Sequence, residues 1–185
     1  MVAWLELTCD HWIMSIAPDA PGVPTGWGNL ELAALGRIVF NFSGLNWCAE
    51  RLLAGFISAD ASALLAVASI TTSRKLKELS AIANGTLATG SLEAKLLRDW
   101  VTGATLLNKE RNSMLHSVWS GGKRPGWMTR ITPRVAKGEW RGESSQVDLD
   151  RLDALADHMR ECSQAAVALA DVLTSCPQWY GQRLR

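Results

Sequence analysis

A cation, an amide and an imidazole lie close together in the run Glu110–His116. Arg111 carries a permanent positive charge, Asn112 carries an amide, and His116 carries an imidazole that can gain or lose a proton. On a helix, Asn112 and His116 stand four positions apart on a face beside Arg111, and Asn108 continues this polar track one turn earlier. These groups can bind an anion and move protons beside it.

The apolar periodicity around this run predicts a long helix from Ser91 to about Val118. On its helical wheel Arg111 points along the centre of an apolar stripe. The stripe consists of Leu97, Trp100, Ala104, Leu107, Met114, Leu115 and Val118. A guanidinium in such a place needs an anion or several acceptors, because a buried unpaired charge is costly. One alternative is that Arg111 pairs with Glu93 or an acid of another helix, and that His116 is favoured by the helix dipole.

The 185 residues, 48% hydrophobic and 20% charged, are typical of one globular domain. We expect an all-α fold, an antiparallel bundle of about four to five helices with a small β-hairpin-like insertion before the last helix. A tryptophan-rich extension packed on the body is expected over residues 1–28, the helical domain over 29–176, and a C-terminal tail over 177–185. The helices are predicted over about 29–57, 60–70, 74–83, 91–118 and 148–176.

The expected insertion covers about residues 120–146. Trp127–Thr132 has the composition of a strand, and Lys137-Gly138 can turn the chain back toward Glu139–Arg141. Cations and indoles alternate in this part of the chain, and we predict weak RNA contacts for Lys123, Arg124, Trp127, Arg130, Arg134, Lys137, Trp140 and Arg141. The alternative is a solvated hairpin whose tryptophans cover the bundle.

Composition and motifs exclude several classes of protein. The formal net charge of +1 gives no strong overall field for nucleic acid or membranes. Four scattered cysteines without a Cys-x-x-Cys pair argue against a zinc site and for reduced thiols. We find no signal peptide and no apolar run of about 20 residues, so a cytoplasmic protein without membrane contact is expected. Gly-rich phosphate loops, His-Glu-x-x-His and Gly-x-Ser-x-Gly do not occur, and no cofactor or metal is expected.

The run Glu110–His116, late in a long helix of a helical domain, resembles the signature of HEPN domains. That signature has an arginine, then a polar residue that is often asparagine, then about three residues and a histidine. The similarity covers this motif and the order of helices over roughly Asn29 to Cys176. The N-terminal tryptophan segment and the hairpin insertion depart from the family pattern and leave the subfamily open.

The resemblance implies a metal-independent endoribonuclease whose site combines residues of two chains in a homodimer. Arg111 would hold the scissile phosphate, His116 would move protons, and Asn112 would orient His116 or the phosphate. Arg111 and His116 lie about 140° apart on the wheel, so one helix alone would not close both around one phosphate. An interface between two copies would also explain the apolar stripe around Arg111.

The family often acts as a toxin or in defence against phage, which implies an antitoxin or a nucleotidyltransferase as a further partner. The alternative is a catalytically inactive HEPN-like helical domain that binds a partner protein, a nucleotide or RNA.

Overall fold

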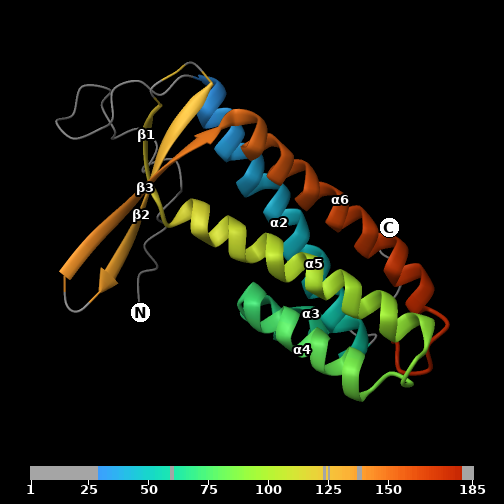
Figure 1. Cartoon of the computed structure of the whole chain (residues 1–185). Coiled ribbons are helices and arrows are strands. Elements are labelled where there is room, and N and C mark those ends of the chain that lie inside the picture. The colour runs from blue at the N-terminus through green and yellow to red at the C-terminus, as the bar shows by residue number, and fades with distance from the viewer. Residues whose placement is uncertain (1–28, 59–60, 123, 125, 137–138, 181–185) are drawn as a thin grey trace, which may run out of the picture.

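The computed structural model describes residues 29–58, 61–122, 124, 126–136 and 139–180. This part of the chain forms five helices and one three-stranded antiparallel sheet (Figure 1). The helices are α2 (Asn29–Ile57), α3 (Ala61–Ala68), α4 (Thr72–Gly85), α5 (Leu92–Leu115) and α6 (Leu149–Leu173). The strands are β1 (Val118–Gly121), β2 (Trp127–Ala136) and β3 (Glu139–Asp148). The predicted helical class, with a small β insertion before the last helix, is confirmed.

Three helices begin at side chains that cap their first turn. Thr71 accepts a hydrogen bond from the Arg74 backbone N–H, Ser91 from that of Ala94, and Asp148 from that of Arg151. Each cap satisfies a backbone donor that the helix itself leaves free. The predicted end of α5 at Val118 is wrong: the helix stops at Leu115, and Val118 begins β1.

The core lies where α2, α5 and α6 run side by side, with α4 packed on α5 (Figure 1). The largest fully buried side chains include Leu45 and Leu52 of α2, Leu97 of α5, and Leu152 and Met159 of α6. Most of the apolar stripe that surrounds Arg111 belongs to this core. The buried members of the stripe are Leu97, Trp100, Ala104 and Met114. The stripe is therefore largely filled by the chain's own helices, and the interpretation of it as a contact between two copies is corrected.

The sheet extends from the end of α5 and returns the chain to the start of α6. The predicted hairpin is confirmed, since β2 and β3 pair antiparallel from Trp127↔Asp148 to Ala136↔Glu139. The sequence did not predict β1, which adds to the other edge of β2. The Trp119 indole N–H donates to the Met114 carbonyl at 2.9 Å. This hydrogen bond joins β1 to the last turn of α5.

Trp179, in the segment after α6, packs against the C-terminal end of α2. Its side chain is buried, its ring meets Phe56 edge to face at 5.0 Å, and the next N–H, that of Tyr180, donates to the Gly55 carbonyl at 2.7 Å. A Cβ atom at Gly55 would lie 2.5 Å from the Trp179 ring. Residues 1–28, expected as an extension, and 181–185, the end of the expected tail, lie outside the described residues.

Replacing Gly55 by alanine is expected to lower the free energy of unfolding by about 1–3 kcal/mol, because an overpacked indole must shift. Urea titration followed by circular dichroism measures this change. Gly36→Ala on the same helix is the matched control, since among the described residues no atom beyond the adjacent turns of α2 lies within 4 Å of its added Cβ. The control should be neutral or stabilising, because alanine favours a helix over glycine. Equal stability of the two variants would contradict the proposed packing.

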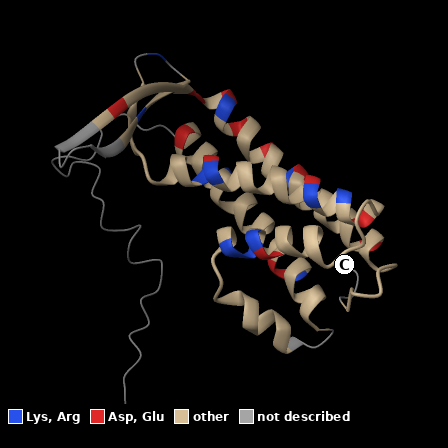
Figure 2. Ribbon diagram, turned by 60° about the horizontal axis from the view of Figure 1, so that its bottom comes forward, with Lys and Arg blue, Asp and Glu red and all other residues tan. Residues whose placement is uncertain are grey.

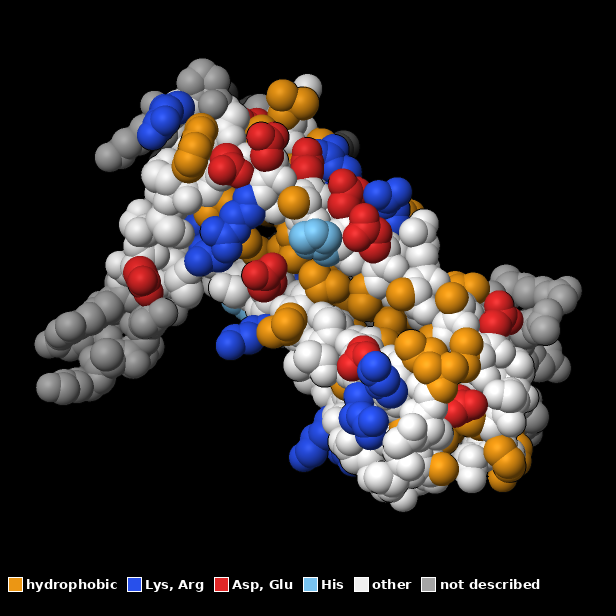
Figure 3. Space-filling view, turned by 45° about the vertical axis from the view of Figure 1, so that its right-hand side comes forward, with side chains coloured by type: hydrophobic (Ala, Val, Ile, Leu, Met, Phe, Trp, Pro, Cys, Tyr) orange, Lys and Arg blue, Asp and Glu red, His pale blue; other side chains and the backbone are white. Residues whose placement is uncertain are grey.

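Charges of both signs are interspersed along the helices, as Figure 2 shows. Figure 3 shows that hydrophobic side chains of the face drawn there lie mainly on the helical body. Between α5 and α6 this body carries an apolar pocket of about 400 Å³, lined by small residues such as Gly103, Ala165 and Ala168. None of the described helices is long and apolar enough to cross a membrane.

Candidate functional site

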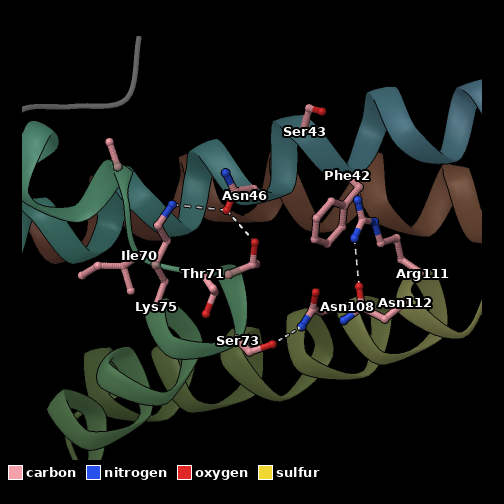
Figure 4. A pocket seen from close by; sticks show the side chains of 12 residues that line it. Phe42, Ser43, Asn46, Ile70, Thr71, Ser73, Lys75, Asn108, Arg111 and Asn112 are labelled. Atoms are coloured by element: carbon pink, nitrogen blue, oxygen red, sulfur yellow. Dashed lines mark hydrogen bonds between the residues drawn. The ribbon is translucent and has the colours of Figure 1, made fainter. Parts of the chain in front are cut away.

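A polar pocket of about 470 Å³ lies between α2, the start of α4 and the last third of α5 (Figure 4). Arg111 and Asn112 of the predicted motif line it, together with Asn108. The opposite walls come from α2, through Phe42, Ser43 and Asn46, and from the segment 70–75 at the start of α4. Its volume lies in the range of pockets that hold small ligands.

Arg111 is held at one end of this pocket by two contacts. Its Cζ lies 4.4 Å from the centre of the Phe42 ring, and its Nη1 donates to Asn112 Oδ1 at 2.9 Å. The guanidinium is half-buried, its Nε is fully shielded from solvent, and in the described part of the chain this Nε has no hydrogen-bond partner. Burial lowers the pKa of Arg111 from its ordinary value, although an arginine stays protonated in a protein.

The expected alternative of an internal ion pair is not found for Arg111. Among the described residues no carboxylate pairs with its guanidinium, and Glu93 instead accepts a hydrogen bond from the Ser175 hydroxyl. The stacking on Phe42 and a single amide contact offset only part of the cost of removing a cation from water. The part of the chain that the structure describes therefore supplies no anion for the Arg111 guanidinium.

The Asn112 side chain supports Arg111, since its Oδ1 accepts from the guanidinium, and in the described structure no hydrogen bond joins it to the imidazole of His116. His116 forms the C-cap of α5, where its backbone N–H donates to the Asn112 carbonyl at 3.1 Å and the next N–H, that of Ser117, donates to the Met114 carbonyl at 3.3 Å. Its side chain is exposed and does not line the pocket. Within one chain the structure thus brings Arg111, Asn112 and Asn108 together and leaves His116 outside.

Lys75 and Asn46 also line the pocket, and neither was predicted as a site residue. Lys75 is almost completely buried, and its Nζ lies 2.8 Å from Glu50 Oε2 and 3.3 Å from Asn46 Oδ1. Asn46 Oδ1 also accepts from the Thr72 hydroxyl at 2.6 Å. Because Glu50 already neutralises Lys75, Arg111 is the one charged group of the pocket walls that pairs with no carboxylate among the described residues. The nearest hint of these residues in the sequence was the run Thr71-Thr72-Ser73. It predicted the cap of α4 but not the pocket that this cap borders.

The predicted basic surface on the insertion is divided by the sheet. Arg124 stacks on the Trp127 ring at 5.0 Å, while Arg130 contacts Met114 of α5 through Nη1 and Sδ at 3.5 Å. Trp127 and Arg130 are three positions apart on β2, and side chains of a strand alternate between its faces. These two residues therefore belong to opposite faces of the sheet.

For the other residues of the predicted basic surface the structure gives at most a position in the sheet. Arg134 and Arg141 are register partners across β2 and β3, and Trp140 is the partner of Val135. Lys123 and Lys137 lie outside the described residues. RNA binding by this surface stays a prediction.

The thiols of the helical core are poor nucleophiles. Burial raises the pKa of Cys48 to about 11, and burial together with the nearby Cys48 raises that of Cys162 to about 11. A thiol with such a pKa stays protonated near neutral pH and does not attack a substrate. In the described ranges no three His, Cys, Asp or Glu side chains gather as a metal site would require.

The chain matches no protein-family model, no curated protein and no solved structure. The resemblance to HEPN domains therefore rests on the Arg-Asn-x-x-x-His run and on its place near the end of a long helix.

Proposed function

We propose that this protein is a metal-independent endoribonuclease, with Arg111, Asn112 and His116 as its site residues. The observation that carries the proposal is the half-buried Arg111, which opens on a polar pocket and has no carboxylate partner among the described residues. A guanidinium binds a phosphate, as it binds a carboxylate, through two parallel hydrogen bonds. Arg111 still has donors to offer, because only Nη1 is engaged in the described structure.

Cleavage would use the 2′-hydroxyl of the RNA itself as nucleophile. The 2′-oxygen bonds to the adjacent phosphorus, the bond from phosphorus to the 5′-oxygen breaks, and a 2′,3′-cyclic phosphate and a 5′-hydroxyl result. The 2′-hydroxyl loses one proton and the 5′-oxygen gains one, and His116 would serve one of these transfers. Arg111 would stabilise the charge that grows on the phosphate oxygens, with Asn112 holding the guanidinium in place.

The separation of Arg111 from His116 supports a site made by two copies. Arg111 enters the pocket beside Phe42, whereas His116 is exposed at the end of α5. A twofold-related copy could bring its own His116 to this pocket, and the reverse contact would complete a second site. We propose a homodimer on this ground, and its interface then lies outside the buried stripe of α5.

The chemistry is tested with an RNA oligonucleotide in the presence of a chelator. We expect cleavage to continue and to leave 2′,3′-cyclic phosphate ends, which mass spectrometry identifies. A single 2′-deoxy substitution should abolish cleavage at that linkage only, because the nucleophile is missing there. Cleavage of the deoxy linkage at an unchanged rate would overturn the mechanism, and loss of all cleavage in chelator would overturn its independence from metal.

The exposed position of His116 also favours a second candidate function, which is binding without cleavage. In a single chain the pocket offers a cation and amides but no proton-transfer group from the motif. A protein of this kind would bind RNA or a nucleotide through Arg111 and leave it intact. Retained RNA binding without any cleaved product would support this candidate over the ribonuclease.

A further inference from the structure

Three asparagine side chains on the pocket wall are each satisfied at one end only. Asn46 accepts through Oδ1 from Thr72 and Lys75, Asn108 donates through Nδ2 to Ser73 Oγ at 2.9 Å, and Asn112 accepts from Arg111. The other end of each amide has no hydrogen-bond partner among the described residues. All three residues line the same pocket, which we call the amide pocket (Figure 4).

The internal hydrogen bonds fix which end of each amide remains free. The amide pocket offers two donors, Asn46 Nδ2 and Asn112 Nδ2, and one acceptor, Asn108 Oδ1. Asn108 as a whole residue is buried, but its Oδ1 is not one of the solvent-shielded side-chain atoms that lack a partner, so this oxygen opens on the pocket. A ligand that enters the pocket removes water from these amide groups, and it loses affinity unless its own groups replace the hydrogen bonds of that water.

A nucleobase carries hydrogen-bond donors and acceptors side by side on one edge, and asparagine amides read such edges well. Sequence-specific RNA recognition uses unpaired bases that are turned into a pocket of this kind. A pocket of about 470 Å³ is large enough for one nucleotide. At its end stands Arg111, the group that would hold the phosphate of the same nucleotide.

We propose that the amide pocket takes one unpaired nucleobase next to the phosphate held by Arg111, and that it sets the base preference of the protein. The proposal deepens the ribonuclease function and rests on it for the place of the phosphate. Asn108 is the specificity residue, since its free oxygen faces a base donor, and it takes no part in proton transfer.

The test uses chimeric oligonucleotides that are 2′-O-methylated except at one ribonucleotide, which is A, C, G or U. Wild-type protein should cleave the best of the four at least about tenfold faster than the worst, as expected for base-specific hydrogen bonds. Asn108→Ala should reduce this ratio to about twofold or less. Asn84→Ala is the matched control: Asn84 is an exposed asparagine of α4 that does not line the amide pocket, so the preference should persist. An unchanged preference in Asn108→Ala would overturn the proposal.

A second variant guards against loss of folding in Asn108→Ala. Ala68 is exposed at the mouth of the pocket, so Ala68→Leu should narrow the pocket without disturbing the core. We expect this variant to lose the base preference and to keep the melting temperature of the wild type. Cleavage with the wild-type preference would contradict a base-binding role of the pocket.

Binding separates this proposal from the proposed ribonuclease function. Fluorescence anisotropy with the fully 2′-O-methylated oligonucleotides needs no cleavage. If no RNA is cleaved but binding depends on the base and weakens at least about fivefold in Ala68→Leu, the ribonuclease proposal fails and the pocket stands. If RNA is cleaved without any base preference, the pocket proposal fails and the ribonuclease stands.

Discussion

Replacing Arg111 by glutamine is expected to lower the rate of RNA cleavage by roughly 10²–10³-fold, the usual cost of removing one group that stabilises transition-state charge. Glutamine keeps a polar but shorter side chain at the pocket and removes the cation. Arg111→Lys should also lose most of the activity, because an ammonium cannot place two parallel donors on a phosphate or stack on Phe42 as a guanidinium does.

The Arg111→Gln variant should lose activity without losing thermal stability. The wild-type guanidinium is half-buried, and no carboxylate among the described residues pairs with it. Removing a desolvated charge without an ionic partner should leave the melting temperature unchanged or raise it. A residue that lowers stability and supports activity is typical of a functional site.

Single-turnover cleavage and thermal unfolding of the same preparation check this pair of effects. Lys109→Gln is the control, because Lys109 is an exposed cation of α5 only two residues away. It should keep wild-type cleavage apart from a small effect on RNA affinity. If Arg111→Gln cleaves RNA like the wild type, Arg111 is not a phosphate ligand. If it is strongly destabilised, Arg111 is a structural residue.

Replacing His116 by alanine is expected to lower the cleavage rate by roughly 10²–10⁴-fold, as the loss of general acid–base catalysis does. RNA affinity and stability should change little, because the His116 side chain is exposed and only its backbone N–H closes the end of α5. His158→Ala is the control, since His158 is an exposed histidine of α6 outside the pocket. Equal cleavage by His116→Ala and wild type would exclude His116 from the reaction.

Local signals explain why most helix boundaries could be predicted from the sequence. Thr71, Ser91 and Asp148 are short polar residues just before apolar periodic runs, and all three cap helices. Such caps depend on neighbouring residues only, so a single sequence contains the information. The strand β1 could not be predicted from its own residues, because it forms only by pairing with Ile131 and the neighbouring residues of β2, which follow later in the sequence.

Only the part of the candidate site that lies on the single helix α5 could be predicted from the sequence. The spacing of Asn108, Arg111 and Asn112 on α5 placed them near one another, and in the structure all three line one pocket. Asn46 and Lys75 reach the same pocket from α2 and α4, and only tertiary packing brings these segments together. The wheel located the buried part of the apolar stripe but also included Val118, which is exposed in β1. A periodic pattern cannot tell whether a stripe meets the chain's own core or a second copy.

A mixture of two inactive variants tests the composite site most directly. Arg111→Gln retains His116, and His116→Ala retains Arg111, so a dimer with one copy of each has one complete site and one site that lacks both groups. Random pairing makes half of the dimers mixed, and we therefore predict that an equimolar mixture, unfolded and refolded together, regains about a quarter of the wild-type cleavage rate. A mixture as inactive as its two components, measured beside refolded active wild type, would contradict a site shared between two copies.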